Sequence, residues 1–150
     1  MRATGGGGDK KEEADAKVFL AIDLQEQGAF EEALELYYQA VELYTQVGGH
    51  DCISVADTYN NMAVVYESQG HYERALEYYQ QSLDITVKVV GHDHKLVADS
   101  KYNLALLHKS RRETDKARQL FLECEQTYSA VYGADHGKTQ KAARQASQCV

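Results

Sequence analysis

Histidine, aspartate and cysteine side chains gather in three short segments of the sequence, and these residue types could ligate a metal ion. The segments are His50-Asp51-Cys52, His92-Asp93-His94 and Asp135-His136. They are about 42 residues apart, and neighbouring residues of one loop point in different directions, so one ion would not collect enough ligands. We therefore expect helix caps and solvated loops rather than a metal site, with Asp93 capping the helix that follows it.

The sequence contains no recognisable catalytic arrangement. None of the six histidines has a nucleophile and an acid in a triad-like setting, and there is no GxGxxG, phosphate-binding loop or HExxH motif. We expect neither an enzyme nor a bound cofactor.

Charge and cysteine content narrow the class of partner and compartment. The net charge of −7 disfavours binding to nucleic acid or to an anionic membrane surface. No stretch approaches the ~18 apolar residues of a membrane helix, so we expect no membrane insertion. Three cysteines without CxxC spacing are typical of reduced thiols in a cytoplasmic protein.

Composition and an internal repeat together predict an all-α protein. The chain of 150 residues has no proline and is rich in Ala, Leu, Glu and Gln, which favour helices. Residues 14–55 and 56–97 are identical at 16 of 42 positions, and 56–97 and 98–139 at 10, whereas composition alone would give about two or three. The period therefore predicts a tandem array of similar structural repeats.

Each repeat is predicted to contain a helix, a tight turn and a second helix. In the second repeat the helices are expected over residues 55–69 and 72–90, with Gly70 ending the first of them. We expect a disordered Gly-rich leader at 1–13, repeats at 14–55, 56–97 and 98–136, and a capping helix at 137–149. This last helix could equally be the first half of a fourth repeat.

The packing positions of the repeat resemble the tetratricopeptide pattern. In the second repeat they are Tyr59, Met62, Ala63, Tyr66, Ala75 and Tyr79. Small residues such as Ala63 and Ala75 allow the two helices to cross closely. The 42-residue period and the segment from Tyr59 to Tyr66 further resemble the repeats of kinesin light chains. This resemblance implies a right-handed α-α superhelix that acts as a protein-interaction adaptor, such as a cargo adaptor.

The resemblance also implies a concave groove, lined by the first helix of each repeat, that binds an extended peptide. The expected peptide-binding residues are Val18, Ile22, Asp57, Asn60, Asn61, Val64, Glu67, Asp99, Tyr102, Asn103, Leu106 and Lys109. Asn61 and Asn103 would hydrogen-bond the peptide backbone, because an amide offers both a donor and an acceptor. Alternatively, each Asn bonds a neighbouring helix or loop.

Apolar and acidic side chains of this groove suggest a class of ligand. The apolar anchors of a peptide would contact five side chains, unless some of these turn into the packing between helices: Val18, Ile22, Val64, Tyr102 and Leu106. Asp15, Asp57, Asp99 and Glu67 would make the rim acidic, which favours a peptide with flanking Lys or Arg. The resemblance to kinesin light chains implies the opposite preference, for acidic peptides.

Two other functions stay open. The chain could be a structural piece whose exposed repeat ends stack on copies of itself, giving a homo-oligomer. It could also be a fragment of a longer repeat protein, since three repeats are near the minimum for stability.

Overall fold

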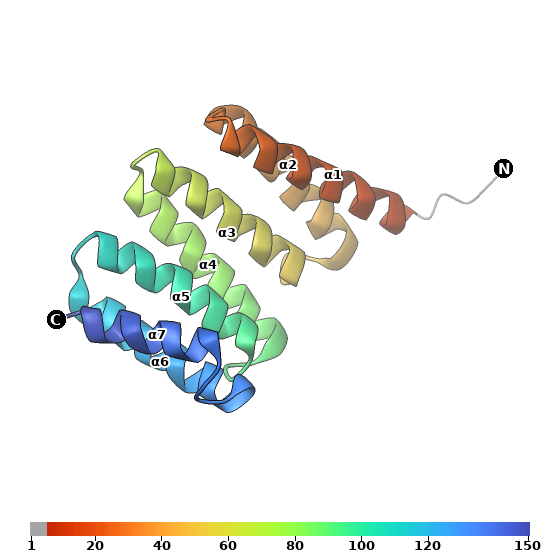
Figure 1. Cartoon of the computed structure of the whole chain (residues 1–150). Helices are drawn as coiled ribbons and strands as arrows, with labels where there is room; N and C mark the ends of the chain where they lie inside the picture. Colours follow the sequence, from red (N-terminus) through yellow and green to blue (C-terminus); the bar gives the residue numbers. More distant parts are fainter. Residues whose placement is uncertain (1–5) are drawn as a thin grey trace. The chain divides into compact units, whose positions relative to one another are not determined.

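The computed structural model describes residues 6–150, and within this range the chain forms α-helices and no strands (Figure 1). The helices are α1 (Gly6–Glu26), α2 (Phe30–Gly48), α3 (Ile53–Ser68), α4 (Tyr72–Val90), α5 (Lys95–Ser110), α6 (Thr114–Tyr132) and α7 (Gly137–Gln148). The predicted all-α class is therefore confirmed. The second helix of the second repeat has the predicted bounds, and α3 and α5 each begin three residues before the expected repeat boundaries at 56 and 98.

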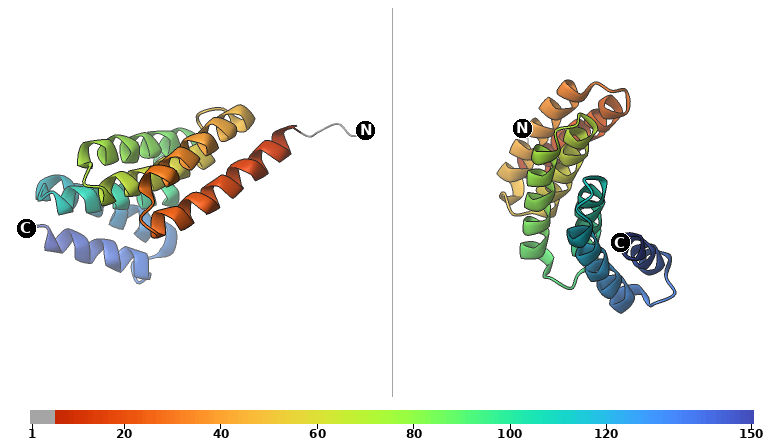
Figure 2. Two further views of the ribbon diagram at one scale, coloured as in Figure 1. Left: turned by 90° about the horizontal axis from the view of Figure 1, so that it is seen from above. Right: turned by 90° about the vertical axis from the view of Figure 1, so that its left-hand side faces the viewer.

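The chain divides into two compact units, which we call the N-terminal unit (up to Ile85) and the C-terminal unit (Thr86–Val150). In the N-terminal unit α1 packs against α2, and α2 packs against α3. In the C-terminal unit α6 packs against both α5 and α7. Helices that follow one another in the chain lie side by side within each unit, as α1 beside α2 and α6 beside α7 show (Figure 2).

Helix α1 starts earlier than the sequence predicts. Residues 6–13 belong to the helix, so the expected disordered leader is wrong for this segment, and only residues 1–5 of it lie outside the described range. Lysine and glutamate are good helix formers. An ion pair of 3.2 Å between Lys11 and Asp15, one turn apart, adds support to this end of the helix.

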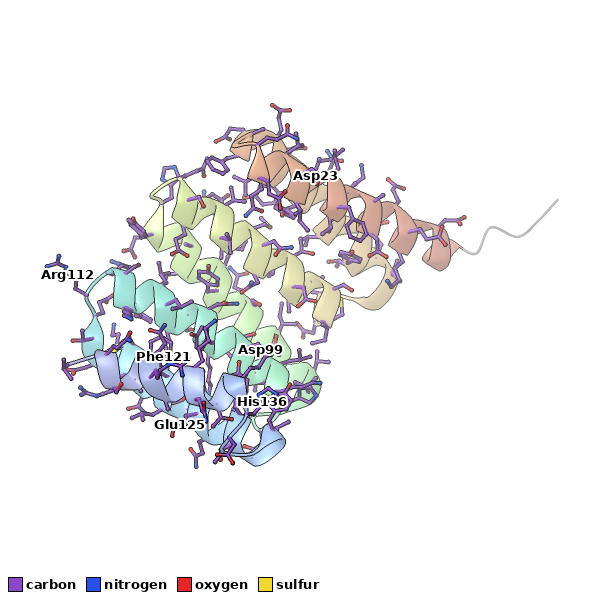
Figure 3. All side chains as sticks on the ribbon, in the orientation of Figure 1. Asp23, Asp99, Arg112, Phe121, Glu125 and His136 are labelled. Atoms are coloured by element: carbon purple, nitrogen blue, oxygen red, sulfur yellow. The ribbon has the colours of Figure 1, made fainter. Side chains whose placement is uncertain are left out.

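The tight turns between paired helices use a left-handed residue. Gly28 and Gly70 both have φ 81°, and the equivalent residue of the third repeat is Arg112 with φ 62°. Glycine adopts this conformation without strain because it lacks a Cβ, whereas arginine does not. The exposed Arg112 side chain projects away from the ribbon at the α5–α6 turn (Figure 3).

Small residues are buried where paired helices approach each other. The alanines predicted at these positions have no exposed surface; they are Ala21, Ala33, Ala63, Ala75, Ala105 and Ala117. In the C-terminal unit Ala105 and Ala117 belong to one core cluster with Phe121. The small residues thus make room for an aromatic ring, as the repeat pattern predicts.

Side chains of the second helices also bond to backbone carbonyls of the first. The Ser82 hydroxyl donates to the Ala56 carbonyl oxygen at 2.7 Å, and the Cys124 thiol donates to that of Ala98 at 3.2 Å. Burial raises the pKa of the Cys124 thiol to about 12. Since Ser82 and Cys124 are 42 residues apart, the same contact holds the two helices of successive repeats.

Histidine, not aspartate, caps the helices after two of the interrepeat loops. Nδ1 of His94 accepts a hydrogen bond from the Leu96 N–H, and Nδ1 of His136 accepts one from the Lys138 N–H, both at 3.1 Å. The expectation that Asp93 is the cap is wrong, because Asp93 lies one residue before the N-cap position of α5.

Candidate peptide-binding site

The residues expected to bind a peptide lie on the first helix of each repeat. Val18 and Ile22 lie on α1, residues 57–67 on α3, and residues 99–109 on α5. Most of these side chains are half-buried, while Asp57 and Leu106 are exposed.

Two of the expected rim aspartates accept hydrogen bonds from tyrosines. The Tyr128 hydroxyl donates to Asp99 at 2.5 Å, and the Tyr44 hydroxyl donates to Asp15 in the equivalent contact of the first repeat. The bond from Tyr44 lowers the pKa of the Asp15 carboxyl. Burial, followed by the bond to Asp99, raises the pKa of the Tyr128 phenol. Each of these carboxylates therefore uses part of its hydrogen-bonding capacity inside the protein.

Glu67 and Lys109 also make internal contacts. Glu67 accepts a hydrogen bond of 2.9 Å from the Tyr79 hydroxyl, 12 residues further along the chain. The ammonium group of Lys109 donates to Gln145 at 2.7 Å and to Gln148 at 2.9 Å. Lys109 thereby connects the end of α5 with the end of α7.

The N-terminal unit shows that one of the proposed apolar anchors takes part in packing. Val18 packs against a core cluster that includes Ala14 and Tyr44, so the alternative of packing between helices applies to it.

Burial raises the pKa of the Asp57 carboxyl, although its side chain keeps contact with solvent. The residue equivalent to Tyr44 and Tyr128 in this repeat is Thr86, so within residues 6–150 Asp57 has no equivalent tyrosine partner.

In the C-terminal unit three of the predicted residues line one pocket. Its volume is about 240 Å³, and it is lined by Asp99, Tyr102, Asn103, Tyr128, Lys138 and Lys141. Helix α5 supplies the first three, α6 supplies Tyr128, and α7 supplies the two lysines. We call this cavity the α5–α7 pocket. Leu106 and Lys109 do not line it.

The charge of the α5–α7 pocket differs from the acidic rim that the sequence suggests. The ammonium group of Lys138 lies 3.4 Å from Asp99 and 5.6 Å from the centre of the Tyr128 ring. The ammonium group of Lys141 lies 5.7 Å from the centre of the Tyr102 ring and makes no ion pair within residues 6–150. With two lysines against one carboxylate, the pocket is net positive.

Sequence reasoning missed Tyr128, Lys138 and Lys141 as site residues. The alanines of the last helix predict a cap, and this interpretation takes no account of its lysines. Sliding the sequence by another 42 residues places Lys141 on Asp99, which is an expected groove position. The period itself therefore contained the signal for Lys141.

Other classes of site find no support in the described part of the chain. Within residues 6–150 no three His, Cys, Asp or Glu side chains come close enough to hold a metal ion. No helix in the same range is long and apolar enough to cross a membrane.

Comparison with known families identifies the repeat. A family model described as tetratricopeptide repeat matches residues 12–86, half of the chain, and a second with the same description matches residues 97–137. The chain belongs to the tetratricopeptide repeat family. Members of this family are generally not enzymes, and the fold supports a role as a protein-interaction scaffold. A search of curated proteins by sequence found no match.

Solved structures share the fold and support the resemblance to kinesin light chain repeats. BtubC (BKLC) from P. vanneervenii has a TM-score of 0.74 at 23% identity, over 91% of this chain and 60% of that one. The nearly identical TPR-like repeats described as a Podosopora anserina kinesin light chain have a TM-score of 0.76 at 19% identity, over 90% of this chain and 64% of that one. The N-terminal domain of stress-induced protein-1 from C.elegans has a TM-score of 0.65 at 19% identity, over 91% of this chain and 96% of that one. The chain thus spans less than two thirds of the first two structures.

Proposed function

We propose that this tetratricopeptide protein is an adaptor that binds an extended segment of another protein along the first helices of its repeats. In the C-terminal unit, an acidic side chain of that segment would enter the α5–α7 pocket. The main support is the pocket itself, which joins three predicted residues with two lysines.

The contacts inside the α5–α7 pocket explain this choice of ligand. Oδ1 of Asp99 accepts a hydrogen bond from Tyr128 and lies 3.4 Å from the ammonium group of Lys138, which offsets part of the attraction of Asp99 for a basic side chain. Lys141 has no carboxylate partner within residues 6–150, and its neighbour is an aromatic ring. A ligand carboxylate would therefore meet an ammonium group at the opening, while the tyrosine rings would contact the aliphatic part of the same side chain.

The N-terminal unit offers a different preference. No Lys or Arg occurs between Val18 and Glu73, and Asp57 remains exposed on α3. The part of the ligand that contacts α1 and α3 is therefore expected to be neutral or basic. The sequence-based expectation of flanking Lys or Arg is kept for this unit and replaced by an acidic side chain in the other.

A peptide array can test the pocket. We suggest synthetic peptides in which Leu and Phe anchors flank a central Glu, Gln or Lys, presented to the intact chain. The central Glu peptides should bind most tightly, and the double variant Lys138→Gln, Lys141→Gln should lose this preference. Lys10→Gln, Lys95→Gln is the matched control, because it removes the same charge from exposed lysines on other helix ends. A preference for central Lys, or an equal loss in the control, would overturn the assignment of the pocket.

A second array tests the groove as a whole. Asn61→Ala and Asn103→Ala remove the amides that the repeat resemblance implicates, one in each unit. If the peptides bind along the first helices, both variants should bind more weakly across the whole array without changing the charge preference. Unchanged binding by both variants would show that peptides bind elsewhere.

A further inference from the structure

The two units of the chain carry net charges of opposite sign, although the chain as a whole is acidic. Residues 1–85 contain 5 Lys and Arg against 16 Asp and Glu, a net charge of −11. Residues 86–150 contain 11 Lys and Arg against 7 Asp and Glu, a net charge of +4. Such a separation creates two surfaces of opposite potential, which can steer and hold an association between molecules.

The positive charge of the C-terminal unit is concentrated at one end. Six cationic side chains lie at the α5–α6 turn and the adjoining end of α7; this basic end surface consists of Lys109, Arg111, Arg112, Lys116, Arg118 and Arg144. The hydrogen bonds from Lys109 to Gln145 and Gln148 hold the end of α7 beside the turn. Arg118 adds a bond of 3.0 Å to the Cys149 carbonyl oxygen. The surface is therefore built from two elements that are fixed to each other.

Only part of this charge is neutralised within the unit. Glu113 lies within ion-pair distance of Arg111 and Lys116, and Asp115 lies 3.1 Å from Arg118. Arg112 and Arg144 are exposed and make no ion pair within residues 6–150. The basic end surface thus retains at least two cations that can meet a carboxylate of another molecule.

Arg112 is an unusual residue for its position. The equivalent turn residues of the other repeats are Gly28 and Gly70, which adopt the left-handed conformation without strain. Arg112 adopts it with a side chain that makes no hydrogen bond or ion pair to the described chain. Strain without an internal benefit is often associated with a functional contact. Here that contact would be made by the guanidinium group, the one part of the residue that glycine lacks.

The N-terminal unit carries the complementary surface. At the α1–α2 turn, four exposed carboxylates form what we call the acidic turn surface: Asp23, Glu26, Glu31 and Glu32. The stretch from Val18 to Glu73 supplies no Lys or Arg to neutralise them. Both surfaces lie at turns between paired helices, so each projects from the end of a helical hairpin.

We propose that the basic end surface docks on the acidic turn surface of a second copy of this chain, giving head-to-tail association. Each molecule would then have one free surface of either sign, so the contact can repeat or close into a ring. The opposite charges of the two surfaces favour a second copy as the partner, and this association does not depend on peptide binding in the α5–α7 pocket.

Sedimentation velocity over a range of protein concentrations tests the proposal. In about 0.01 M salt, where the Debye length is about 30 Å, wild-type protein should associate, and in about 1 M salt, where it is about 3 Å, the assembly should dissociate. Arg112→Glu, Arg144→Glu and, separately, Asp23→Lys, Glu26→Lys should each weaken association by at least about tenfold, because like charges then face each other. The control Lys10→Glu, Lys95→Glu makes the same change of charge as the first variant at other exposed sites and should associate like the wild type.

An equimolar mixture of the two reversal variants provides a check that is insensitive to misfolding. In the mixture the reversed surfaces are again opposite in sign, so association should return, which two damaged proteins would not show. A wild-type chain that stays monomeric in low salt would overturn the proposal and leave the basic end surface for another anionic partner. Association that resists high salt, or a control as weak as the reversal variants, would overturn it as well.

Discussion

Replacing Arg112 with glycine should make the protein more stable, although it removes a large side chain. A residue other than glycine in the left-handed conformation costs roughly 1–2 kcal/mol. Glycine also increases the entropy of the unfolded chain, which offsets about 0.4–1 kcal/mol of that gain. Because the Arg112 side chain makes no hydrogen bond or ion pair within residues 6–150, little else is lost. The expected net effect is a free energy of unfolding higher by about 0.5–1 kcal/mol.

Urea denaturation followed by circular dichroism, in high salt to suppress association, measures this difference. The midpoint should rise without a change in the slope, and Tm should rise by about 1–4 °C for a chain of this size. Gly70→Ala is the converse experiment at the equivalent turn. A Cβ there meets no atom within 4 Å, so any loss of stability must come from the backbone conformation. If Arg112→Gly is neutral or destabilising while Gly70→Ala destabilises, the assigned strain at Arg112 is wrong.

Three other substitutions test packing and charge within single repeats. Tyr79→Phe removes the bond to Glu67 and should destabilise by about 1 kcal/mol, measured by urea denaturation. Met62→Ala should cost about 2–5 kcal/mol, whereas Leu20→Ala at the equivalent but 51% exposed position should cost under about 0.5 kcal/mol in the same assay. A hydrogen bond from the buried His108 lowers the pKa of the Glu113 carboxyl below 4.5. The contribution of this contact to stability is therefore present above the pKa of the unfolded state and is lost as pH falls through the pKa of the folded state. Glu113→Gln should therefore lose less stability than wild type in melts below about pH 4.5.

The sequence predicted most of the fold because helix pairs repeat with a fixed period. Residues such as Ala63 and Ala105 recur at the same step and are fully buried. The early start of α1 is not predicted, because the glycines before Asp9 indicate disorder, although the Lys and Glu residues after them favour a helix. Capping by His94 was missed for a related reason, since aspartate is the commoner cap and lies next to it.

The candidate site was predicted only in part. A periodic sequence indicates which helix face repeats, and three residues that it assigns to one face, Asp99, Tyr102 and Asn103, line the α5–α7 pocket. It does not indicate which side chains are satisfied internally, because the tyrosine that bonds Asp99 is 29 residues away on another helix. The positive charge of the pocket depends on α7. The period assigns Lys141 to a groove position, whereas Lys138 can be assigned only from the position of α7 against α6.

The three thiols differ in burial, so their rates of alkylation can report on local unfolding of the chain. Cys52 is half-buried in the N-terminal unit, whereas Cys124 and Cys149 are buried in the C-terminal unit. Since the thiolate is the reactive form, a raised pKa and burial both protect Cys124 from alkylation. Mass spectrometry after timed alkylation should therefore find Cys52 modified first. The delay before Cys124 and Cys149 react would measure how often residues 86–150 unfold while the rest of the chain stays folded.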